Sequence, residues 1–331
     1  MNARRAQTLA ARVLAAGIAG HLAVTTAAPA AAQPFPHRQI QFVIPFAAGG
    51  GSDVMARIIA EPLAQRLGQT VFVDNKPGGG ATIGADFVAK SAPDGHTWLH
   101  TSPGPQIINP YLMAKLPYDP QKDLLPVARL GTFTSVLAVH PGVPARTVRE
   151  LIDYAKANPR KVNFASAGIG SGSHLASEYF RTVAGIDIVH VPYKGTGNAL
   201  QDLVAGNVQM TIDSMAALLP SIKAGSLRAL AVTTLDRSPN LPDVPTLADT
   251  LAGFDASPMN YLSVRGGTPR EVVDRINREV NAVLAMPAIR ERLLALGVVA
   301  TPSTPEEIAA QVKAEQVKWK RVIELSGAKA E

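Results

Sequence analysis

The pattern of apolar and polar positions predicts a strand–turn–helix–strand unit between residues 40 and 80. Residues 39–44 are rich in β-branched and aromatic side chains, as in a buried strand. Apolar residues then recur at helical spacing over residues 54–67, and a second apolar strand follows at residues 70–73. Because a helix here connects two strands, the unit reads as βαβ, which favours an α/β fold with parallel strand pairs.

A glycine turn, residues 49–51, separates the first strand from its helix. We expect Ser52 to cap this helix and Asp53 to lie in its first turn, where a carboxylate suits the helix dipole. Open α/β sheets bind ligands at the carboxyl ends of their parallel strands. The turn is therefore a candidate ligand loop, although glycines there could equally serve only a tight turn.

A second unit of this kind begins at residue 162, with a strand, a glycine turn at residues 167–172 and a helix. Further strands and helices alternate up to residue 232, and helices dominate from residue 269 onwards. Residues 125–140 form a long β-prone run that could carry the chain from one domain to another. A third strand in the first half ends near Ser102, which makes that turn a candidate second lip of the site.

The first 32 residues resemble an export signal. Three arginines precede a stretch rich in alanine and leucine, and Ala30, Ala31 and Ala32 give a small-residue cleavage pattern. We therefore expect cleavage near Ala32 and a periplasmic protein. A disordered alanine-rich tail is the structural alternative, and Arg4 with Arg5 could instead mark a twin-arginine signal.

Composition and charge exclude several kinds of partner and site. The formal charge of +6 falls to +3 without the three arginines of the signal, and the chain shows no basic run with interleaved aromatic residues, so we expect no nucleic-acid partner. The absence of cysteine excludes disulfides and thiolate sites. His96 and His100 are four residues apart but have no third ligand nearby, so we expect no metal and no cofactor.

The two glycine turns suggest how a ligand is held. A helix N-terminus offers unpaired N–H groups and a partial positive charge, which suit a carboxylate. Asp53 would compete with such an anion at the first turn, whereas the second turn carries no acid, so we place the ligand carboxylate at the second. The residues expected there are Ser166, Gly170, Ser171, Ser173 and His174.

The other side of the ligand should face Phe46, Ala48 and Gly49. We expect these residues to supply an apolar wall and backbone or water-mediated contacts. Lys194 and Asp213, at the ends of neighbouring strands, are the charged residues best placed to bind the rest of it.

Each of these residues also has a purely structural interpretation. Ser171 and Ser173 could serve only as helix caps, and Asp213 could cap the following helix. His174 could be a packed core imidazole and Lys194 a surface lysine.

Across nearly the whole chain after residue 32, the sequence resembles the Bug (TctC-like) substrate-binding proteins of tripartite tricarboxylate transporters. The resemblance is carried by motifs in the family's order, among them IPFAAGGGSDVMARIIAEPLAQRLGQ, VDNKPGGGATIGADFVAKSAPDGHT, YAKANPRKVNFASAGIGSGSHLASE and HVPYKGTGNALQDLVAGNVQM. The sequence departs from the family pattern at His96, Asn198 and Tyr261, which leaves the ligand open.

The resemblance implies a two-domain periplasmic binding protein of the type II-like class. Each domain would be a mostly parallel sheet flanked by helices, with two crossover strands as the hinge. Domain I would comprise residues 33–136 and 232–331, and domain II residues 137–231. The motif positions that match the family's ligand site are Phe46, Ala48, Gly49, Asp53, Ser166, Gly170, Ser171, His174, Lys194 and Gly195.

The implied function is capture of a small organic acid by a monomeric protein that is not an enzyme and that delivers the acid to an integral-membrane permease. A ligand sensor that signals to a membrane partner has the same sequence features. A dinucleotide-dependent enzyme is the distant alternative, because Gly168, Gly170 and Ser173 loosely match a dinucleotide fingerprint. The following strand lacks the acidic residue that binds a ribose, which argues against that enzyme.

Overall fold

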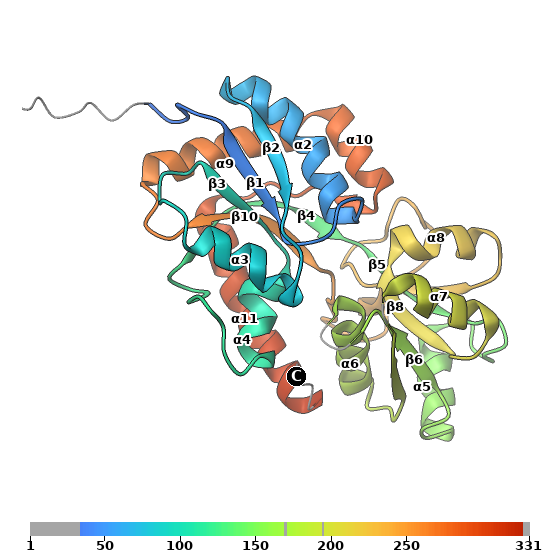
Figure 1. The fold of residues 1–331 in the computed structure, drawn as a ribbon. Coiled ribbons are helices and arrows are strands. Elements are labelled where there is room, and N and C mark those ends of the chain that lie inside the picture. Colours follow the sequence, from blue (N-terminus) through green and yellow to red (C-terminus); the bar gives the residue numbers. More distant parts are fainter. Residues whose placement is uncertain (1–33, 169–170, 194, 327–331) are drawn as a thin grey trace, which may run out of the picture. The chain divides into compact units, whose positions relative to one another are not determined.

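A computed structural model of the protein describes residues 34–168, 171–193 and 195–326. From residue 35 onwards these residues form one compact unit that contains two β-sheets (Figure 1). The six-stranded sheet has the order β11 (Val298–Val299), β4 (Leu124–Phe133), β10 (Met259–Arg265), β3 (Thr97–Thr101), β1 (Ile40–Ile44) and β2 (Val71–Asn75). The five-stranded sheet has the order β7 (Val189–Pro192), β6 (Asn163–Ser166), β8 (Met210–Ser214), β5 (Ser135–Val139) and β9 (Arg228–Val232).

Both sheets are mixed, which corrects the expectation of mostly parallel sheets. In the first sheet β1 pairs in parallel with β2 and β3, while β10 runs antiparallel to β3 and β4. In the second, β6 is parallel to β7 and β8, while β5 is antiparallel to β8 and β9. The antiparallel pairs involve β4, β5, β9 and β10, which lie next to the segments that pass from one sheet to the other. The expected βαβ units therefore form the parallel part of each sheet.

Helices cover the faces of the first sheet. On one face, α2 (Gly51–Leu67), α9 (Arg270–Leu284) and α10 (Pro287–Ala295) pack against one another (Figure 1). They bury the apolar side chains of alternate strand residues such as Ile40, Phe42 and Ile44. The neighbouring residue Val43 points to the other face, where α3 (Thr82–Ala89) lies. Because helices cover both faces of this strand, its residues are apolar and buried apart from Gln41.

The helices of the second sheet are α5 (Val148–Ala157), α6 (Gly172–Ala184), α7 (Thr196–Ala205) and α8 (Met215–Lys223). The C-terminal helix α11 (Pro305–Ser326) contacts β4 and the short helical segment η2 (Gly104–Ile108) of the first sheet, and also α6. The remaining short elements are η1 (Gly79–Ala81), α4 (Asn109–Leu112) and η3 (Leu247–Asp249). One hydrophobic cluster consequently runs from the second sheet to α11.

Two segments carry the chain between the sheets. The first is the continuous pair β4 and β5, which confirms that the β-prone run around residues 125–140 crosses between them. The return runs from β9 to β10 through residues 233–258, which hold only η3 and turns. The domain limits given above remain predictions, and the expected signal at residues 1–32 lies outside the described residues.

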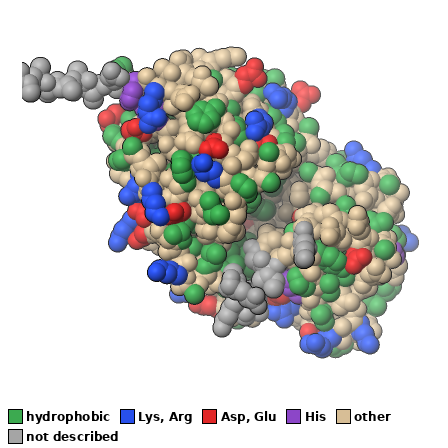
Figure 2. Space-filling model, in the orientation of Figure 1, with side chains coloured by type: hydrophobic (Ala, Val, Ile, Leu, Met, Phe, Trp, Pro, Cys, Tyr) green, Lys and Arg blue, Asp and Glu red, His purple; other side chains and the backbone are tan. Residues whose placement is uncertain are grey.

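Charged side chains of both signs lie on the visible surface. Figure 2 shows lysine and arginine side chains interspersed with aspartate and glutamate on the face that it draws. In the described part of the chain, no helix is long and apolar enough to cross a membrane. Within the same ranges, no group of three or more His, Asp or Glu side chains is arranged to hold a metal ion.

Candidate functional site

A cleft of about 830 Å³ opens where the carboxyl ends of strands from both sheets meet. Of the predicted site residues that the structure describes, five line it: Phe46, Ser102, Ser171, Ser173 and Asp213. The volume lies in the range of small-molecule pockets, and the walls combine apolar side chains with a few polar groups, as such pockets commonly do.

The N-terminus of α6 forms one wall of the cleft. Ser171 is the N-cap, and its side chain accepts a 3.2 Å hydrogen bond from the His174 N–H. The Ser173 hydroxyl accepts a 2.9 Å bond from the Ala167 N–H and lies 3.1 Å from the Ser171 hydroxyl. Ser171 and Ser173 thus do stabilise the helix start, as the structural interpretation holds, and they also face the cleft. The first turn of a helix leaves N–H groups without intrahelical partners and favours an anion.

Ser166 and His174 lie behind this turn rather than on the cleft wall. Ser166 is fully buried, and its hydroxyl is 2.6 Å from Nε2 of His190. The His174 ring stacks on the His190 ring with 4.1 Å between centroids, and His190 stacks on Phe164. Burial lowers the pKa of His174 and of His190 to about 4, so both rings are neutral at pH 7. They support the turn by packing and bring no positive charge to it.

Asp213 lines the cleft from the end of β8. Its carboxylate accepts a 2.7 Å hydrogen bond from the Ser214 N–H and a 3.0 Å bond from the Thr196 hydroxyl. Burial raises the pKa of Asp213, and the hydrogen bonds from Ser214, Thr196 and Ser173 only partly offset that effect. The N-cap of α8 is Ser214, so Asp213 is not the cap of that helix.

The first glycine turn contributes to the cleft differently from the expectation. The helix begins at Gly51 with Gly50 as its N-cap and no side-chain cap bond, so the prediction that Ser52 caps it was wrong. Gly51 and Ser52 instead line the cleft. Asp53 lies in the first helical turn as predicted, but its side chain is buried under the turn.

Ala48 and Gly49 lie on the exposed turn and are not among the residues that line the cleft. Gly195 is the N-cap of α7 with a φ of 124°, a conformation that favours glycine, and its neighbour Thr196 reaches the cleft. Gly170 and Lys194 lie outside the described residues. Direct ligand contacts of all these residues remain predictions.

Sequence reasoning missed a further loop of the site, which follows β2. Gly79, Gly80 and Ala81 line the cleft, and all three have positive φ. Asn109, another lining residue, donates a 2.9 Å hydrogen bond from Nδ2 to the Gly80 carbonyl and so fixes the loop. The sequence did contain a pattern that could have indicated this loop. Three glycines follow a strand that pairs in parallel with β1, and the carboxyl ends of such strands share one edge of the sheet.

An apolar region completes the cleft. Phe133 comes from the end of β4, Met113 from the turn after α4, Leu175 from α6 and Trp319 from α11. These side chains come from segments far apart in the sequence. The cleft therefore offers a polar end at the N-terminus of α6 and an apolar body, which suits a small molecule with an anionic group and a carbon chain.

Residues 55–328 match the sequence model of the family described as "Tripartite tricarboxylate transporter family receptor". The chain is 42% identical over 316 residues to a UPF0065 protein from the tcbD-tcbE intergenic region of Pseudomonas sp. (strain P51), covering 94% of this chain and 93% of that one. It is 39% identical over 305 residues to the protein BugT of Bordetella pertussis, covering 92% and 94%.

Solved structures with the same fold include Rpa4515 of R. palustris with adipate (TM-score 0.78, 35% identity, 89% of this chain and 99% of that one). The periplasmic binding protein BugD is similar as well (TM-score 0.74, 34% identity, 90% and 100%). MatC of Rhodopseudomonas palustris with bound malate is a third (TM-score 0.73, 34% identity, 87% and 100%). The similarity to these proteins confirms the predicted fold class.

Proposed function

Because the chain belongs to the tripartite tricarboxylate transporter receptor family of periplasmic solute-binding proteins, we propose that it captures a small carboxylate-bearing solute and delivers it to a membrane permease of that transporter type. The proposal includes export of the chain, with residues 1–32 removed near Ala32, and action as a monomer. It also holds that the solute is released chemically unchanged.

The observation that carries this proposal is the N-terminus of α6 at the wall of a cleft lined from both sheets. Hydrogen bonds from main-chain N–H groups to a charged ligand are each worth about 1.5–3 kcal/mol. Two or three such bonds, together with burial of the carbon chain against Phe133, Met113 and Trp319, are sufficient for micromolar binding. Adipate and malate in two similar proteins support a dicarboxylate as the solute class.

The cleft residues can be given roles in this proposal. Ser171 and Ser173 hold the helix end that receives one carboxylate. The Gly79–Ala81 loop and Ser102 approach the solute from the first sheet, and Asp213 lies beside it. For the predicted residues behind the cleft wall, including Asp53, Ser166 and His174, we propose that they position the loops.

A thermal-shift screen of mono-, di- and tricarboxylates, acidic amino acids and aromatic acids tests the function. A true solute at one hundred times its Kd should add about 2.7 kcal/mol to the stability of the folded protein. Calorimetry should then give one site, and chromatography should recover the solute unaltered. A shift with neutral compounds only, or a recovered product, would contradict the proposal.

Uptake of the radiolabelled solute in cells that lack this gene separates transport from sensing. We expect uptake to be lost and then restored by the intact gene. Normal uptake in the deletion strain would favour the sensor.

A further inference from the structure

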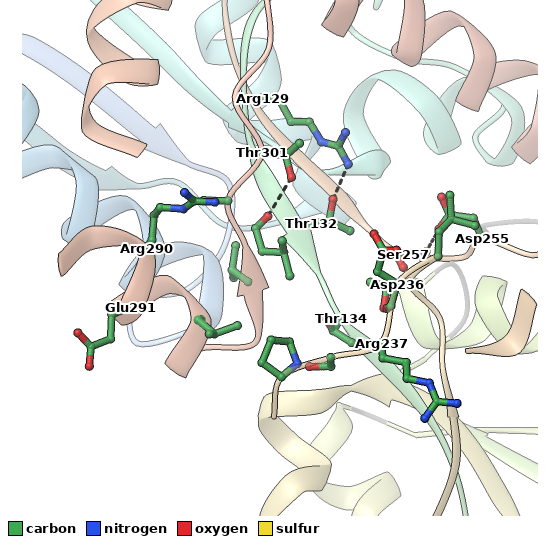
Figure 3. A pocket seen from close by; sticks show the side chains of 18 residues that line it. Arg129, Thr132, Thr134, Asp236, Arg237, Asp255, Ser257, Arg290, Glu291 and Thr301 are labelled. Atoms are coloured by element: carbon green, nitrogen blue, oxygen red, sulfur yellow. Dashed lines mark hydrogen bonds between the residues drawn. The ribbon is translucent and has the colours of Figure 1, made fainter. Parts of the chain in front are cut away.

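A second cavity, of about 640 Å³, lies beside the segments that carry the chain between the two sheets (Figure 3). Its walls come from the end of β4, from residues 234–239, 255 and 257 of the return segment, and from α10 and β11. Nothing in the function proposed above uses these residues.

The two cavities share the same segments but not the same side chains. Along β4 and β5, Thr132 and Thr134 line the second cavity, whereas Phe133 and Ser135 line the cleft. The return segment repeats this division, with residues 255 and 257 on one side and residues 256 and 258 on the other. Successive side chains of an extended chain point to opposite faces, so these two segments form a wall between the cavities. A change in their twist must alter both cavities at once.

The chemistry of the second cavity centres on Arg129. Its Nη2 donates a 2.6 Å hydrogen bond to the Thr132 hydroxyl, as Figure 3 shows, while its Nε is buried with no hydrogen-bond partner among the described residues. Burial lowers the pKa of Arg129, and Asp255 and Glu315 act on it in the opposite direction. Arg129 as a whole is half-buried, but its buried Nε is an unpaired donor of a charged group, which is unfavourable unless an anion beside the guanidinium compensates it.

The two nearby carboxylates have other partners. Asp255 accepts a hydrogen bond from the Ser257 N–H. Glu315 forms an ion pair with Lys318 at 2.6 Å and accepts a bond from the Trp319 indole. Arg129 is therefore the charged group of this cavity that most needs an external anion.

The remainder of the cavity favours an aliphatic ligand. Leu235 and Val299 line it and are large apolar side chains that stay 60% and 40% exposed. Leu294 and Val298 extend the same apolar surface. A carbon chain that covered this surface would remove it from water.

We propose that this cavity is a second ligand site for a small amphipathic monocarboxylate, with the carboxylate at Arg129 and the alkyl chain on Leu235 and Val299, and that its occupancy regulates the cleft. The coupling follows from the shared wall, since a ligand that fixes the crossing segments changes the freedom of the cleft residues on their opposite faces. Such coupling is reciprocal, so a cleft ligand must change the affinity of the second site by the same factor.

Octanoate is a suitable probe. Isothermal titration calorimetry on the unaltered full protein and three variants shows at which site octanoate binds. Arg129→Met removes the charge and keeps most of the packing. Arg237→Met is the matched control, because Arg237 is exposed on the rim of the same cavity and extends away from Thr132 and Thr134 (Figure 3). Ser171→Asp places a negative charge at the cleft wall.

We expect octanoate to bind the unaltered protein, Arg237→Met and Ser171→Asp with affinities within threefold of one another, and to bind Arg129→Met at least tenfold more weakly. Unchanged thermal unfolding of Arg129→Met without octanoate establishes that this variant is folded. Loss of binding in Ser171→Asp but not in Arg129→Met would place octanoate in the cleft and overturn the second site. Equal binding by all four forms, or by none, would overturn it as well.

The emission of Trp319 tests the coupling without a cleft ligand. Trp319 lines the cleft and is not among the residues that line the second cavity. Octanoate should change the emission of Ser171→Asp, and the change should vanish when Trp319→Phe is added. Octanoate binding with unaltered emission would contradict the regulatory part of the proposal. These measurements do not require a dicarboxylate to bind. A failure of the second site can therefore be distinguished from a failure of the proposed transport function.

Discussion

The main-chain N–H of Gly49 donates a 2.9 Å hydrogen bond to the buried carboxylate of Asp53. The same carboxylate accepts a 3.0 Å bond from Nδ2 of Asn75 and 3.1 Å bonds from Nε of Arg57. Nδ2 of Asn75 also donates to the Phe46 carbonyl. Burial alone would raise the pKa of Asp53, but the bonds from Arg57, Gly49 and Asn75 outweigh it and the pKa lies below its ordinary value. Asp53 therefore fixes the first glycine turn from beneath.

Replacement of Asp53 by alanine should destabilise the protein. It leaves three hydrogen-bond donors without their acceptor, and we expect the free energy of unfolding in urea at pH 7 to fall by about 2–4 kcal/mol. Glu61→Ala, at an exposed position of the same helix, should change it by less than about 0.5 kcal/mol.

The pH dependence of this difference follows from the lowered pKa of Asp53. Its stabilising effect is fully present above the unfolded value of 3.8 and is lost as the pH falls through the lower folded value. The difference in stability between the two variants should therefore become smaller as the pH falls below 3.8. Equal stability of Asp53→Ala and Glu61→Ala at pH 7 would contradict the structural role of Asp53.

Replacement of Ser171 by aspartate should abolish carboxylate binding and preserve the fold. Aspartate caps helices about as well as serine, so the bond to the His174 N–H can be kept and the melting temperature of the free protein should barely change. The new charge would lie where the ligand carboxylate is expected and should weaken binding at least a hundredfold in calorimetry.

Ser171→Asn is the matched control for this variant, because asparagine also caps helices but carries no charge. It should weaken binding far less than the aspartate does. If the aspartate variant bound the solute as tightly as the asparagine variant, the carboxylate would have to lie elsewhere.

The sequence sufficed to predict the parts of the structure that depend on local patterns. The Gly51–Leu67 and Gly172–Ala184 helices follow from apolar periodicity, and the turns before them from glycine. Near the C-terminus, Thr304 and Glu307 form the hydrogen bonds of a capping box at the start of the helix that begins at Pro305. In these cases the determining contacts lie within a few residues of each other.

The parts that could not be predicted depend on contacts across the chain. No local pattern shows that β10 inserts between β3 and β4, which makes the sheet mixed. The stacking of His174 on His190 joins residues that no periodicity relates. Trp319 reaches the cleft from the last helix, and no local pattern indicates this either. Residue type marked the glycine loops as candidates, but only the fold shows which of their residues face the cleft.

Acid should destabilise the second sheet through its histidine pair. Burial holds the pKa of His174 and His190 near 4 in the folded protein, below the ordinary value of 6.5. Their stabilising effect is thus complete above pH 6.5 and is lost as the pH falls from 6.5 towards 4, because the unfolded chain takes up the protons first. Arg181 and Glu178 form an ion pair beside the His174 ring. Burial raises the pKa of Glu178, so protonation of that carboxylate favours the folded protein and opposes part of the histidine effect.

We expect the melting temperature to fall by several degrees between pH 7 and pH 5. His190→Gln should reduce this slope, and His140→Gln, at a histidine outside the pair, should keep it. A melting temperature with the same pH slope in both variants would exclude the pair as its cause.

Carboxylate binding should become tighter as the pH falls, because of Asp213. Its pKa is raised by burial, with hydrogen bonds from Ser214, Thr196 and Ser173 opposing the effect. A ligand carboxylate in the same cleft disfavours the charged form further, so binding must draw a proton onto Asp213. Affinity should therefore rise as the pH falls through the raised pKa of Asp213, by at most about tenfold per pH unit.

Calorimetry in buffers with different ionisation enthalpies measures this proton uptake directly. Asp213→Asn should remove both the uptake and the pH dependence, and at pH 8 it should bind at least as tightly as the unaltered protein. Asp202→Asn is the control, because that carboxylate is paired with Tyr193 and is absent from the residues lining the cleft. A large loss of affinity in Asp213→Asn at every pH would show instead that an ionised Asp213 accepts a hydrogen bond from the solute, and a hydroxy acid would then be favoured over a plain dicarboxylate.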